Sequence, residues 1–529
     1  MLCASAVARV VASEMQPPPS AVTRPCNGQS DRGSGLQCPE QVGRAYAGRH
    51  GTIWLREGNL SDAATRFLEL LTQAPDHGLR SSDYHLQTID ALRREDAADR
   101  FERDKALDVL LTDAFFLYLS HLADGRLNPA EIEPDWKSYR DPVDYIALLE
   151  TASRYPDGVD QAMDAVLPVH PGYDRLRRAL RVFREATAAR IPWDPIPRGP
   201  SLRVGDDDQR VVAVRSRLFQ TRDLDSSEAR GEPSVFDDDL EQAVKRFQRR
   251  HGLVDDGVVG KRTIVEMNYT PQQRMAQLMV NLERWRWAPR DPGERYILVN
   301  TPAFELQVME QWREVLSMPV VVGKDYRRTP VFRSEITYIV TNPRWHIPRR
   351  IAIEDILPRV WVDPDYLTDR NIGVYLTLGG KTVRMDPKDV DWLSLHENNF
   401  PYRLVQEPGP TNPLGKVKFM FPNAYDVYLH DSPERWLFNY AVRDFSSGCV
   451  RLSDAQALLS YLVQCEGDCD LDAVTRAQRE NKERRVNMKK PIPIYLDYRT
   501  AWVDADGDVH FRPDLYGRDE RLVRVLEPS

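Results

Sequence analysis

The chain has 529 residues, a formal net charge of -8 at pH 7 and an isoelectric point near 5.8. With 42% hydrophobic and 29% charged residues it has the composition of a soluble globular protein, and its length predicts about three or four domains. The acidic balance argues against a general nucleic-acid binder, which needs a basic surface. No apolar run approaches the ~20 residues that cross a bilayer, so the sequence predicts a soluble protein or a soluble ectodomain without a membrane span.

The first 45 residues are rich in Pro, Ser, Gly, Arg and Gln and are predicted to form a flexible head. The opening segment MLCASAVARVVASEM has a short apolar stretch but no basic start, and Arg9 interrupts it. Two interpretations remain open for this segment, a disordered leader and the remnant of an export signal.

The six cysteines fall into two groups, Cys3, Cys26 and Cys38 in the head, and Cys449, Cys465 and Cys469 near the C-terminal end. The Cys465–Cys469 pair is either a local disulfide or two free thiols. No second Cys/His pair lies at zinc-ligand spacing nearby, and DADGD at 504–508 fails the calcium-loop pattern. We therefore expect no metal site, and Asp506-Gly507 is predicted to form a hairpin turn.

Residues 46–195 are predicted to form a helical scaffold domain. The segment LSDAATRFLELLTQA opens on Ser61 as a helix N-cap, and ALDVLLTDAFFLYLSHLADG repeats apolar residues at helical spacing and ends at Gly125. The proline-rich IPWDPIPRGP at 191–200 marks a domain boundary.

Residues 200–270 are predicted to form a three-helix unit whose last two helices are separated by a glycine-rich loop. The segment AVKRFQRRHGL followed by DGVVGKRT resembles the small peptidoglycan-binding domain found beside many cell-wall enzymes. The residues that carry this resemblance are Phe247, Gln248, Gly252, Leu253, Asp256, Gly257, Gly260 and Thr263. The alternative is that Phe247, Leu253 and Ile264 only form the core of a small bundle, since such a fold can be kept without binding a ligand.

The overall prediction is a multidomain α+β protein. A linking helix at 271–294, with Trp285 and Trp287 packed as core aromatics, precedes a mostly antiparallel β domain at 295–480. Residues 346–407 are too long for a connecting loop and hold two helical patterns, IPRRIAIEDILPRV and KDVDWLSLHENN, so we interpret them as a lid-like helical insertion. Residues 481–529 are predicted to form a β-hairpin that completes this domain.

Candidate chemistry lies in YLHDSPERWLFNYAVRDFSSGCVRL, residues 428–452. His430 ends a strand pattern, and Cys449 follows a loop of small residues. A cysteine attacks as the thiolate, so it needs a partner that takes its proton and amides that hold the developing oxyanion. We expect His430 to be that partner and the amides of Gly448 and Cys449 to be the oxyanion donors. A lone cysteine or histidine is more often structural, which is the competing interpretation.

The longer segment PGPTNPLGKVKFMFPNAYDVYLHDSPERWLFNYAVRDFSSGCVRL resembles the catalytic core of the L,D-transpeptidases, in the large subgroup with a helical scaffold and a peptidoglycan-binding module. The resemblance extends from about residue 45 to the end of the chain. The family motif is commonly His-Gly, a spacer, then Ser-His-Gly-Cys and an Arg. Here Asp431 replaces the first glycine and Ser447 the second histidine, so His430 is the imidazole that the resemblance assigns as base.

The resemblance implies that Cys449 is the nucleophile and that His430 accepts and later returns its proton. Further residues are implied to line or shape the substrate site: Ser446, Ser447, Asp431, Tyr428 and Arg451. Arg451 either anchors a substrate carboxylate or forms a structural salt bridge. Trp345, Trp392 and Trp436 are either walls of the site or core residues, and core packing is the default for each.

The reaction that the resemblance implies is a two-step acyl transfer without a cofactor. Cys449 attacks the amide between diaminopimelate and the terminal D-Ala of a tetrapeptide stem, D-Ala leaves, and a thioester remains. A diaminopimelate amine of a second stem then forms a 3→3 cross-link, whereas water would give L,D-carboxypeptidase activity. Peptidoglycan stems in the periplasm or cell envelope are the expected partners, with wall-synthesis proteins as further ones, and carbapenems are expected to acylate Cys449.

Two other functions compete with this one. A papain-like thiol protease is disfavoured because its Cys-Gly-Ser-Cys-Trp-like signature is absent and the nucleophile here follows the base in the chain. A non-catalytic wall-binding scaffold that kept the fold is the other alternative, and an inert Cys449 thiol would favour it.

Overall fold

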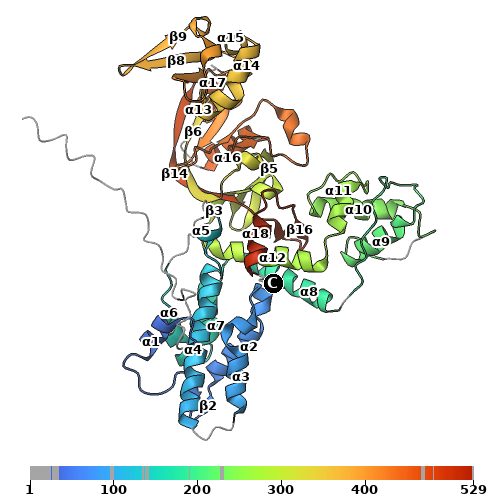
Figure 1. Cartoon of the computed structure of the whole chain (residues 1–529), viewed down its shortest axis with the longest axis vertical. Helices are drawn as coiled ribbons and strands as arrows, with labels where there is room; N and C mark the ends of the chain where they lie inside the picture. The colour runs from blue at the N-terminus through green and yellow to red at the C-terminus, as the bar shows by residue number, and fades with distance from the viewer. Residues whose placement is uncertain are drawn as a thin grey trace, which may run out of the picture. The chain divides into compact units, whose positions relative to one another are not determined.

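The computed structural model describes residues 26, 35–95, 100–133, 136, 142–189, 191–226, 231–465, 471–479 and 482–526. The chain divides into two compact units (Figure 1). The first comprises Met1–Asn128, Ser138–Val169 and Leu282–Arg290, and the second comprises Pro129–Lys137, His170–Asn281 and Asp291–Ser529.

The first unit is helical, as the sequence predicts. Its elements are α1 (Pro39–Tyr46), β1 (Leu55–Arg56), β2 (Asn59–Leu60), α2 (Asp62–Thr72), η1 (Ala74–His77), η2 (Ser81–Tyr84), α3 (Leu86–Arg94), α4 (Arg100–Asp124), α6 (Tyr145–Arg154) and α7 (Gly158–Val166). The Ser61 side chain caps α2 by accepting a hydrogen bond from the Ala64 amide, which confirms the predicted N-cap. Helix α4 ends before Gly125, whose φ of 80° is left-handed and suits glycine.

Helix α4 is the core of this unit. By length and composition alone it could cross a membrane, but 78% of its apolar window is buried inside the protein. Its Phe115 packs against Trp54 and Phe67, with ring centroids 5.4 Å away in both cases. The helix also carries two buried aspartates, Asp108 and Asp113, which is costly unless they are hydrogen-bonded. A buried core helix can be as long and as apolar as a membrane span, so length and composition do not distinguish the two.

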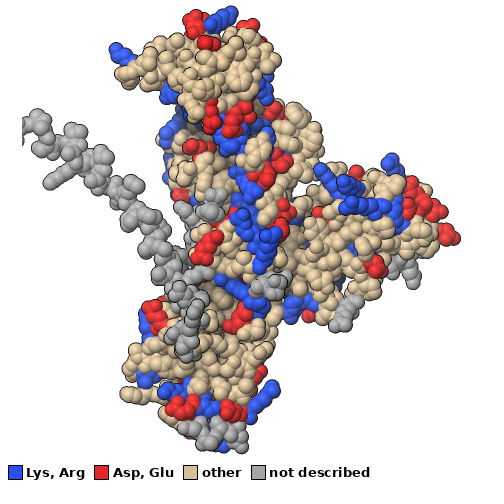
Figure 2. Space-filling view, viewed as in Figure 1, with Lys and Arg blue, Asp and Glu red and all other residues tan. Residues whose placement is uncertain are grey.

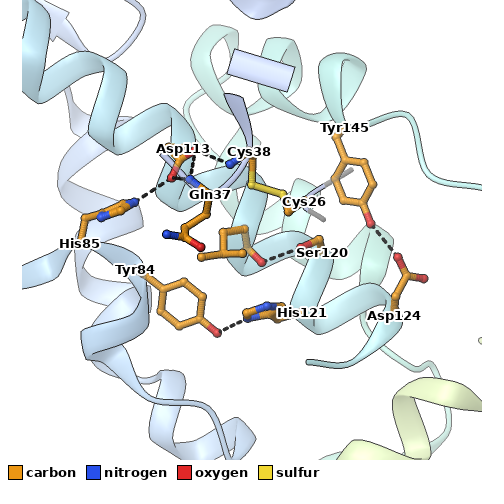
Figure 3. The surroundings of a disulfide bond; sticks show 11 residues. Cys26, Gln37, Cys38, Tyr84, His85, Asp113, Ser120, His121, Asp124 and Tyr145 are labelled. Atoms are coloured by element: carbon orange, nitrogen blue, oxygen red, sulfur yellow. Dashed lines mark hydrogen bonds and ion pairs between the residues drawn. A yellow bond between two sulfur atoms is a disulfide. The ribbon is translucent and has the colours of Figure 1, made fainter. Parts of the chain in front are cut away.

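Asp113 joins α4 to the segment before α1 (Figure 3). Its carboxylate accepts hydrogen bonds from the Gln37 amide at 3.0 Å and the Cys38 amide at 2.7 Å, and it contacts Nε2 of His85 at 2.7 Å. Cys38 is fully buried and forms a disulfide with Cys26. The predicted flexible head therefore stops earlier than residue 45, because the described residues from 35 onward are tied to α4. Cys3 and Cys469, and the side chain of Cys465, lie outside the described residues.

The second unit contains the other helices and both larger sheets. Its helical elements outside the barrel and insertion are α5 (Pro129–Ile132), α8 (Pro171–Ala188), α9 (Arg210–Gln220), α10 (Asp238–Arg250), α11 (Lys261–Met267), α16 (Ala455–Cys465), α17 (Leu471–Arg479) and α18 (Arg518–Leu526). Helix α12 (Pro271–Trp287) runs through the division between the units, and its Trp285 and Trp287 are buried.

Helices α9, α10 and α11 form the predicted three-helix module. Its signature residues hold the loop between α10 and α11: Oε1 of Gln248 accepts from the Gly257 amide, and its Nε2 donates to Asp256 Oδ1 and the Val258 carbonyl. Gly252 has a φ of 64°, and a Cβ there would lie 2.5 Å from the Arg512 side chain. These residues therefore specify the fold of the module and its packing.

The β domain is a closed barrel with strand order β11-β12-β13-β5-β4-β3-β14-β6. The strands are β3 (Arg295–Asn300), β4 (Glu305–Glu310), β5 (Arg313–Val321), β6 (Phe332–Thr341), β11 (Val417–Met420), β12 (Leu429–His430), β13 (Val450–Leu452) and β14 (Arg484–Asp497). Most neighbours are antiparallel, but β12 pairs with β13 and β14 with β3 in parallel. The barrel core includes Leu429, Val450 and Leu452, with residues of α16.

The insertion between β6 and β11 has its own core and its own sheet (Figure 1). Its elements are β7 (Trp345–His346), α13 (Arg349–Ile351), the π-helical turn η5 (Ala352–Ile356), α14 (Leu357–Val362), α15 (Tyr366–Asp369), β8 (Ile372–Leu378), β9 (Lys381–Met385) and β10 (Tyr402–Gln406). The first predicted helix is confirmed by α13–α14. The second is wrong, because 388–399 forms only short turns, and the four-stranded sheet was not predicted.

The C-terminal region also differs in part from the prediction. Strand β14 belongs to the barrel, whereas the hairpin is the two-stranded sheet of β15 (Ala501–Val503) and β16 (Val509–Phe511). Its turn contains Gly507 at a φ of 93°, as expected for Asp506-Gly507. Helix α18 was not predicted. On the face in Figure 2, acidic and basic side chains are interspersed.

Replacing Asp113 by Ala is expected to weaken the anchoring of α1, because the amides of Gln37 and Cys38 would lose their buried acceptor. We expect amide hydrogen exchange in residues 37–46 to report a loss of about 2–4 kcal/mol in opening free energy. The matched control is Asp160→Ala, which removes an exposed pair with Arg66 and is expected to cost no more than ~1 kcal/mol. Equal protection in the two variants would contradict the role of Asp113.

Candidate active site

The parallel pairing of β12 with β13 places the two candidate catalytic residues on neighbouring strands. Leu429 is opposite Val450 and His430 is opposite Arg451. Side chains alternate along a strand, so Leu429 and Val450, both fully buried, face the barrel core. His430 and Cys449, each one position away, point to the other face, where they are diagonal neighbours across the pair.

The Cys449 thiol is partly buried and has several polar neighbours. Its sulfur lies 3.7 Å from the Asp426 carbonyl oxygen, which accepts the thiol hydrogen, and it contacts both the backbone and the hydroxyl of Tyr428. Burial raises the pKa of the thiol to about 11, although the hydrogen bonds from Tyr428 and the charge of Arg451 oppose this. The thiol is therefore protonated at neutral pH in the resting protein.

His430 is 4% exposed, and the Asp431 carbonyl holds its ring at a distance of 2.6 Å from Nδ1. Burial, followed by the charge of Arg451, lowers the pKa of the imidazole to about 3. The ring is therefore neutral at pH 7. Nδ1–H donates to the Asp431 carbonyl, and the Pro413 carbonyl also lies within hydrogen-bonding distance of the ring. No hydrogen bond joins His430 to Cys449 within the described part of the chain.

The loop before the cysteine has a fixed conformation. Ser446 is buried, its Oγ donates to the Cys449 carbonyl at 2.6 Å and accepts from the Gly448 amide at 3.1 Å. Gly448 has a φ of 117°, which favours glycine, and Thr329 Oγ1 donates to its carbonyl at 2.9 Å. The Gly448 amide is thus occupied in this conformation, and its role as an oxyanion donor stays a prediction. Among the described residues, none accepts a hydrogen bond from the Cys449 amide.

Three of the predicted substrate-site residues are held by other side chains. The Asp431 carboxylate accepts from the Lys416 amide at 2.9 Å and pairs with Arg435 at 2.6 Å, so it stabilises the turn after His430. The Arg451 guanidinium pairs with Glu434, which favours the structural interpretation while leaving its charge close to the thiol. Ser447 is exposed and accepts a hydrogen bond from Arg327.

The tryptophans divide between the two interpretations. Trp345 and Trp392 pack against the core of the insertion, which agrees with the default for both. Trp436 is 56% exposed and lies in the segment between His430 and Cys449, with Tyr440 edge-on at 5.9 Å between ring centroids. Its exposure leaves it available as a wall for a bound substrate.

Lys418 is a site residue that the sequence did not reveal. It is opposite His430 on β11, and its Nζ lies 5.7 Å from the centroid of the Tyr428 ring. Burial lowers its pKa, and its charge is close enough to the Cys449 thiol to act on it. The alternation in KVKFM was visible in the sequence, but the register that brings Lys418 beside His430 was not.

A separate cavity lies on the three-helix module. It has a volume of about 350 Å³ and is lined by Arg198, Gly199, Lys261, Ile264, Val265, Asn268, Tyr269 and Gln273. Two cationic side chains and a phenol thus surround an aliphatic surface on α11. Such a lining suits a ligand with a carboxylate and a short apolar part.

Three family models match the chain in the order that the sequence predicts. A model described as "Scaffold domain" matches residues 40–180, one described as "Putative peptidoglycan binding domain" matches 209–267, and one described as "L,D-transpeptidase catalytic domain" matches 294–478. The catalytic-domain match contains both His430 and Cys449.

A curated protein of Haemophilus influenzae named "Putative L,D-transpeptidase" is 36% identical over 246 residues, which are 46% of this chain and 48% of that protein. The chain thus spans about half the length of this relative. Solved structures of L,D-transpeptidases from Xylanimonas cellulosilytica and Mycobacterium smegmatis are 15% and 14% identical, with TM-scores of 0.19 and 0.18. They cover 57% and 39% of this chain and 100% and 58% of their own, and at these TM-scores they add nothing to the assignment.

The sequence resemblance, the three family models and the sequence relative agree: the chain contains a region that matches the L,D-transpeptidase catalytic domain, preceded by matches to a scaffold domain and a peptidoglycan-binding domain.

Proposed function

We propose that this protein is a cysteine-dependent L,D-transpeptidase that forms 3→3 cross-links between peptidoglycan stems. The observation that supports this most directly is the common face of β12 and β13, which gathers Cys449, His430, Tyr428 and Arg451 within the matched catalytic domain. In the proposed first step the sulfur attacks the carbonyl carbon between diaminopimelate and D-Ala. The C–N bond then breaks, D-Ala leaves as the amine, and a thioester remains on Cys449.

The proton moves from Cys449 to His430 during the attack in this proposal. The resting pair is neutral, because burial raises the pKa of the thiol and lowers that of the imidazole. This transfer requires the thiol to turn away from the Asp426 carbonyl and the ring to present a nitrogen with a free lone pair to it. Lys418 and Arg451 supply positive charge beside the sulfur, which favours the thiolate as it forms. His430 then returns the proton to the leaving amine.

We assign the oxyanion to the Cys449 amide and the Tyr428 hydroxyl. The Gly448 amide already donates to Ser446, whereas the Tyr428 hydroxyl lies against the sulfur. Burial, and then the neighbouring Cys449 and Asp426, raises the pKa of Tyr428 well above its ordinary value. The phenol therefore keeps its hydrogen and can donate it to the tetrahedral intermediate.

The acceptor decides the outcome of the second step. A diaminopimelate amine of another stem gives the 3→3 cross-link and frees the thiol, while water gives L,D-carboxypeptidase activity. Both outcomes use the same acyl-enzyme. The exposed Trp436 and Tyr440 are positioned beside the catalytic loop as a surface for the acceptor stem.

The domains that act on peptidoglycan suggest a location in the cell envelope. The Cys26–Cys38 disulfide is consistent with that location, because disulfides persist in oxidising compartments such as the periplasm.

The cavity on the three-helix module is our candidate for a second contact with the wall. Stem peptides carry carboxylates beside short apolar side chains, which matches Arg198 and Lys261 around Ile264 and Val265. Binding there would hold the enzyme on its polymeric substrate and raise the local concentration of stems at Cys449.

The full chain incubated with disaccharide-tetrapeptide is expected to give cross-linked dimers that lack one D-Ala, detected by mass spectrometry. Cys449→Ala is expected to abolish both the dimers and the release of D-Ala, because the thioester cannot form. The control is Cys449→Ser, which keeps the side-chain volume and is expected to retain little activity, since a hydroxyl is far harder to deprotonate. Undiminished product from Cys449→Ala would place the chemistry elsewhere.

The kcat/KM for D-Ala release is expected to change by less than about threefold between pH 5 and pH 9, because neither group of the neutral pair titrates in this window. His430 becomes charged only near pH 3 and the Cys449 thiol ionises only near pH 11. In His430→Gln the rate is expected to rise about tenfold per pH unit toward pH 11, as it then follows the thiolate fraction. A step near pH 6.5 in the parent enzyme would contradict the neutral pair.

The double variant Arg198→Gln/Lys261→Gln is expected to bind purified peptidoglycan roughly tenfold more weakly in a pull-down assay, since it loses charge-assisted hydrogen bonds to carboxylates. Its control, Arg203→Gln/Arg262→Gln, removes the same charge from the same module outside the cavity. D-Ala release from a small soluble muropeptide should be unchanged in both. If both double variants bound peptidoglycan equally weakly, the loss would reflect the net charge of the module and would contradict a binding site in the cavity.

A further inference from the structure

Arg327 connects the catalytic loop to the insertion. It ends the short turn η4 (Asp325–Arg327), and its side chain is only 6% exposed. Its guanidinium is shared by three side chains from two distant parts of the chain. One is Ser447 in the catalytic loop, and the other two are Glu354 and Asp355 in the π-helical turn η5 of the insertion.

On the loop side, Nη1 of Arg327 donates to Ser447 Oγ at 2.7 Å, two residues before the nucleophile. The backbone of the same segment also borders the loop: a Cβ on Gly448 would lie 3.9 Å from the Arg327 carbonyl oxygen. Thr329 then donates to the Gly448 carbonyl. The segment around Arg327 thus contacts the loop through both its side chain and its backbone.

On the insertion side, the same Nη1 donates to Asp355 Oδ2 at 2.7 Å, and Nη2 pairs with Glu354. The two carboxylates are about two-fifths exposed, at 44% and 42%, so water solvates them while the guanidinium is buried. Asp355 is thus joined to Ser447 by one nitrogen atom. No direct hydrogen bond between Asp355 and Ser447 is present in the described structure.

We propose that Arg327 is a positioning residue that couples docking of the insertion to the conformation of the nucleophile loop. A buried guanidinium that loses its carboxylate partners is costly, so the docked insertion and the Arg327–Ser447 contact stabilise each other. Motion of η5 away from the barrel would release Ser447 and, through it, the loop that orients Cys449. π-helical turns of this kind are frequent at functional sites.

This inference rests on the proposed function only in taking Cys449 as the nucleophile. The loop has further restraints, the Ser446 hydrogen bonds and the Thr329–Gly448 hydrogen bond, so loss of Arg327 is expected to change its populations without unfolding it. We therefore expect the reactivity of the Cys449 thiol to depend on whether the insertion is docked.

The test is a double-mutant cycle on the full chain with Ser447→Ala and Asp355→Asn. The measured quantity is the rate of Cys449 alkylation by iodoacetamide at fixed pH, with mass spectrometry confirming the modified residue. Because the two side chains meet only through Arg327, we expect their effects to be non-additive by about threefold or more. The same cycle in an Arg327→Met background is expected to be additive. Additive effects in the parent background would overturn the proposal.

Amide hydrogen exchange supplies a readout that needs no thiol reactivity. Arg327→Met is expected to increase exchange in both 349–362 and 444–452, and Arg327→Lys, which keeps the charge but offers a single ammonium, to increase it less. The matched control is Arg328→Met, whose guanidinium pairs with Asp325 and lies over the Tyr516 ring. Increased exchange in only one of the two segments would overturn the coupling.

The two proposals fail in different ways. Loss of D-Ala release from the parent enzyme with a non-additive cycle would refute the transpeptidase function and keep the coupling. Normal D-Ala release together with an additive cycle would support the transpeptidase function and refute the coupling.

Discussion

The parallel contact between β12 and β13 is the constraint on which the site depends. Only two residues on each strand are paired, Leu429 with Val450 and His430 with Arg451. The contact is held from outside, by β11 on one side and β5 on the other, and by a buried Leu429 and Val450 that have no alternative place in the core. A shift by one residue would turn both out of the barrel core and carry His430 and Cys449 into it.

Burial gives this site its electrostatic character. Desolvation opposes the charged form of both the thiol and the imidazole, so the resting pair is neutral, unlike a thiolate–imidazolium pair. The nearby cations, Lys418 and Arg451, then act mainly on charge that develops during attack. Both cations have a carboxylate neighbour, Glu434 for Arg451 and Glu483 for Lys418. This arrangement suits a thiol that stays protonated and unreactive until a bound substrate has displaced water from it.

The chain uses its accessory parts for different tasks. In the three-helix module the signature residue Gln248 locks a loop, while the cavity with Arg198 and Lys261 lies on another part of the module. The insertion, in turn, has its own core and sheet, and Arg327 joins it to Ser447 in the catalytic loop.

Local features were predictable from the sequence, because they depend on neighbours along the chain. The cap at Ser61, the end of α4 before Gly125, the Asp506-Gly507 turn, the three-helix module and the match to the catalytic-domain model could all be predicted in this way. Cys449 and His430 also stood out, since a thiol after Ser-Ser-Gly and an imidazole at a strand end are unusual residue types in those positions. Their roles stay proposals.

Other features depend on strand register and on contacts between distant parts of the chain, so only the tertiary structure decided them. The sheet within the insertion, the Cys26–Cys38 pairing, Lys418 beside His430 and the contact of Arg327 with Ser447 join residues between 12 and 120 positions apart. The occupied Gly448 amide likewise depends on which way the Ser446 hydroxyl points. Sequence determined the chemical groups that this protein carries, whereas the pairing of its strands determined which of those groups meet, because hydrogen-bond register is fixed by the whole barrel and not by any single segment.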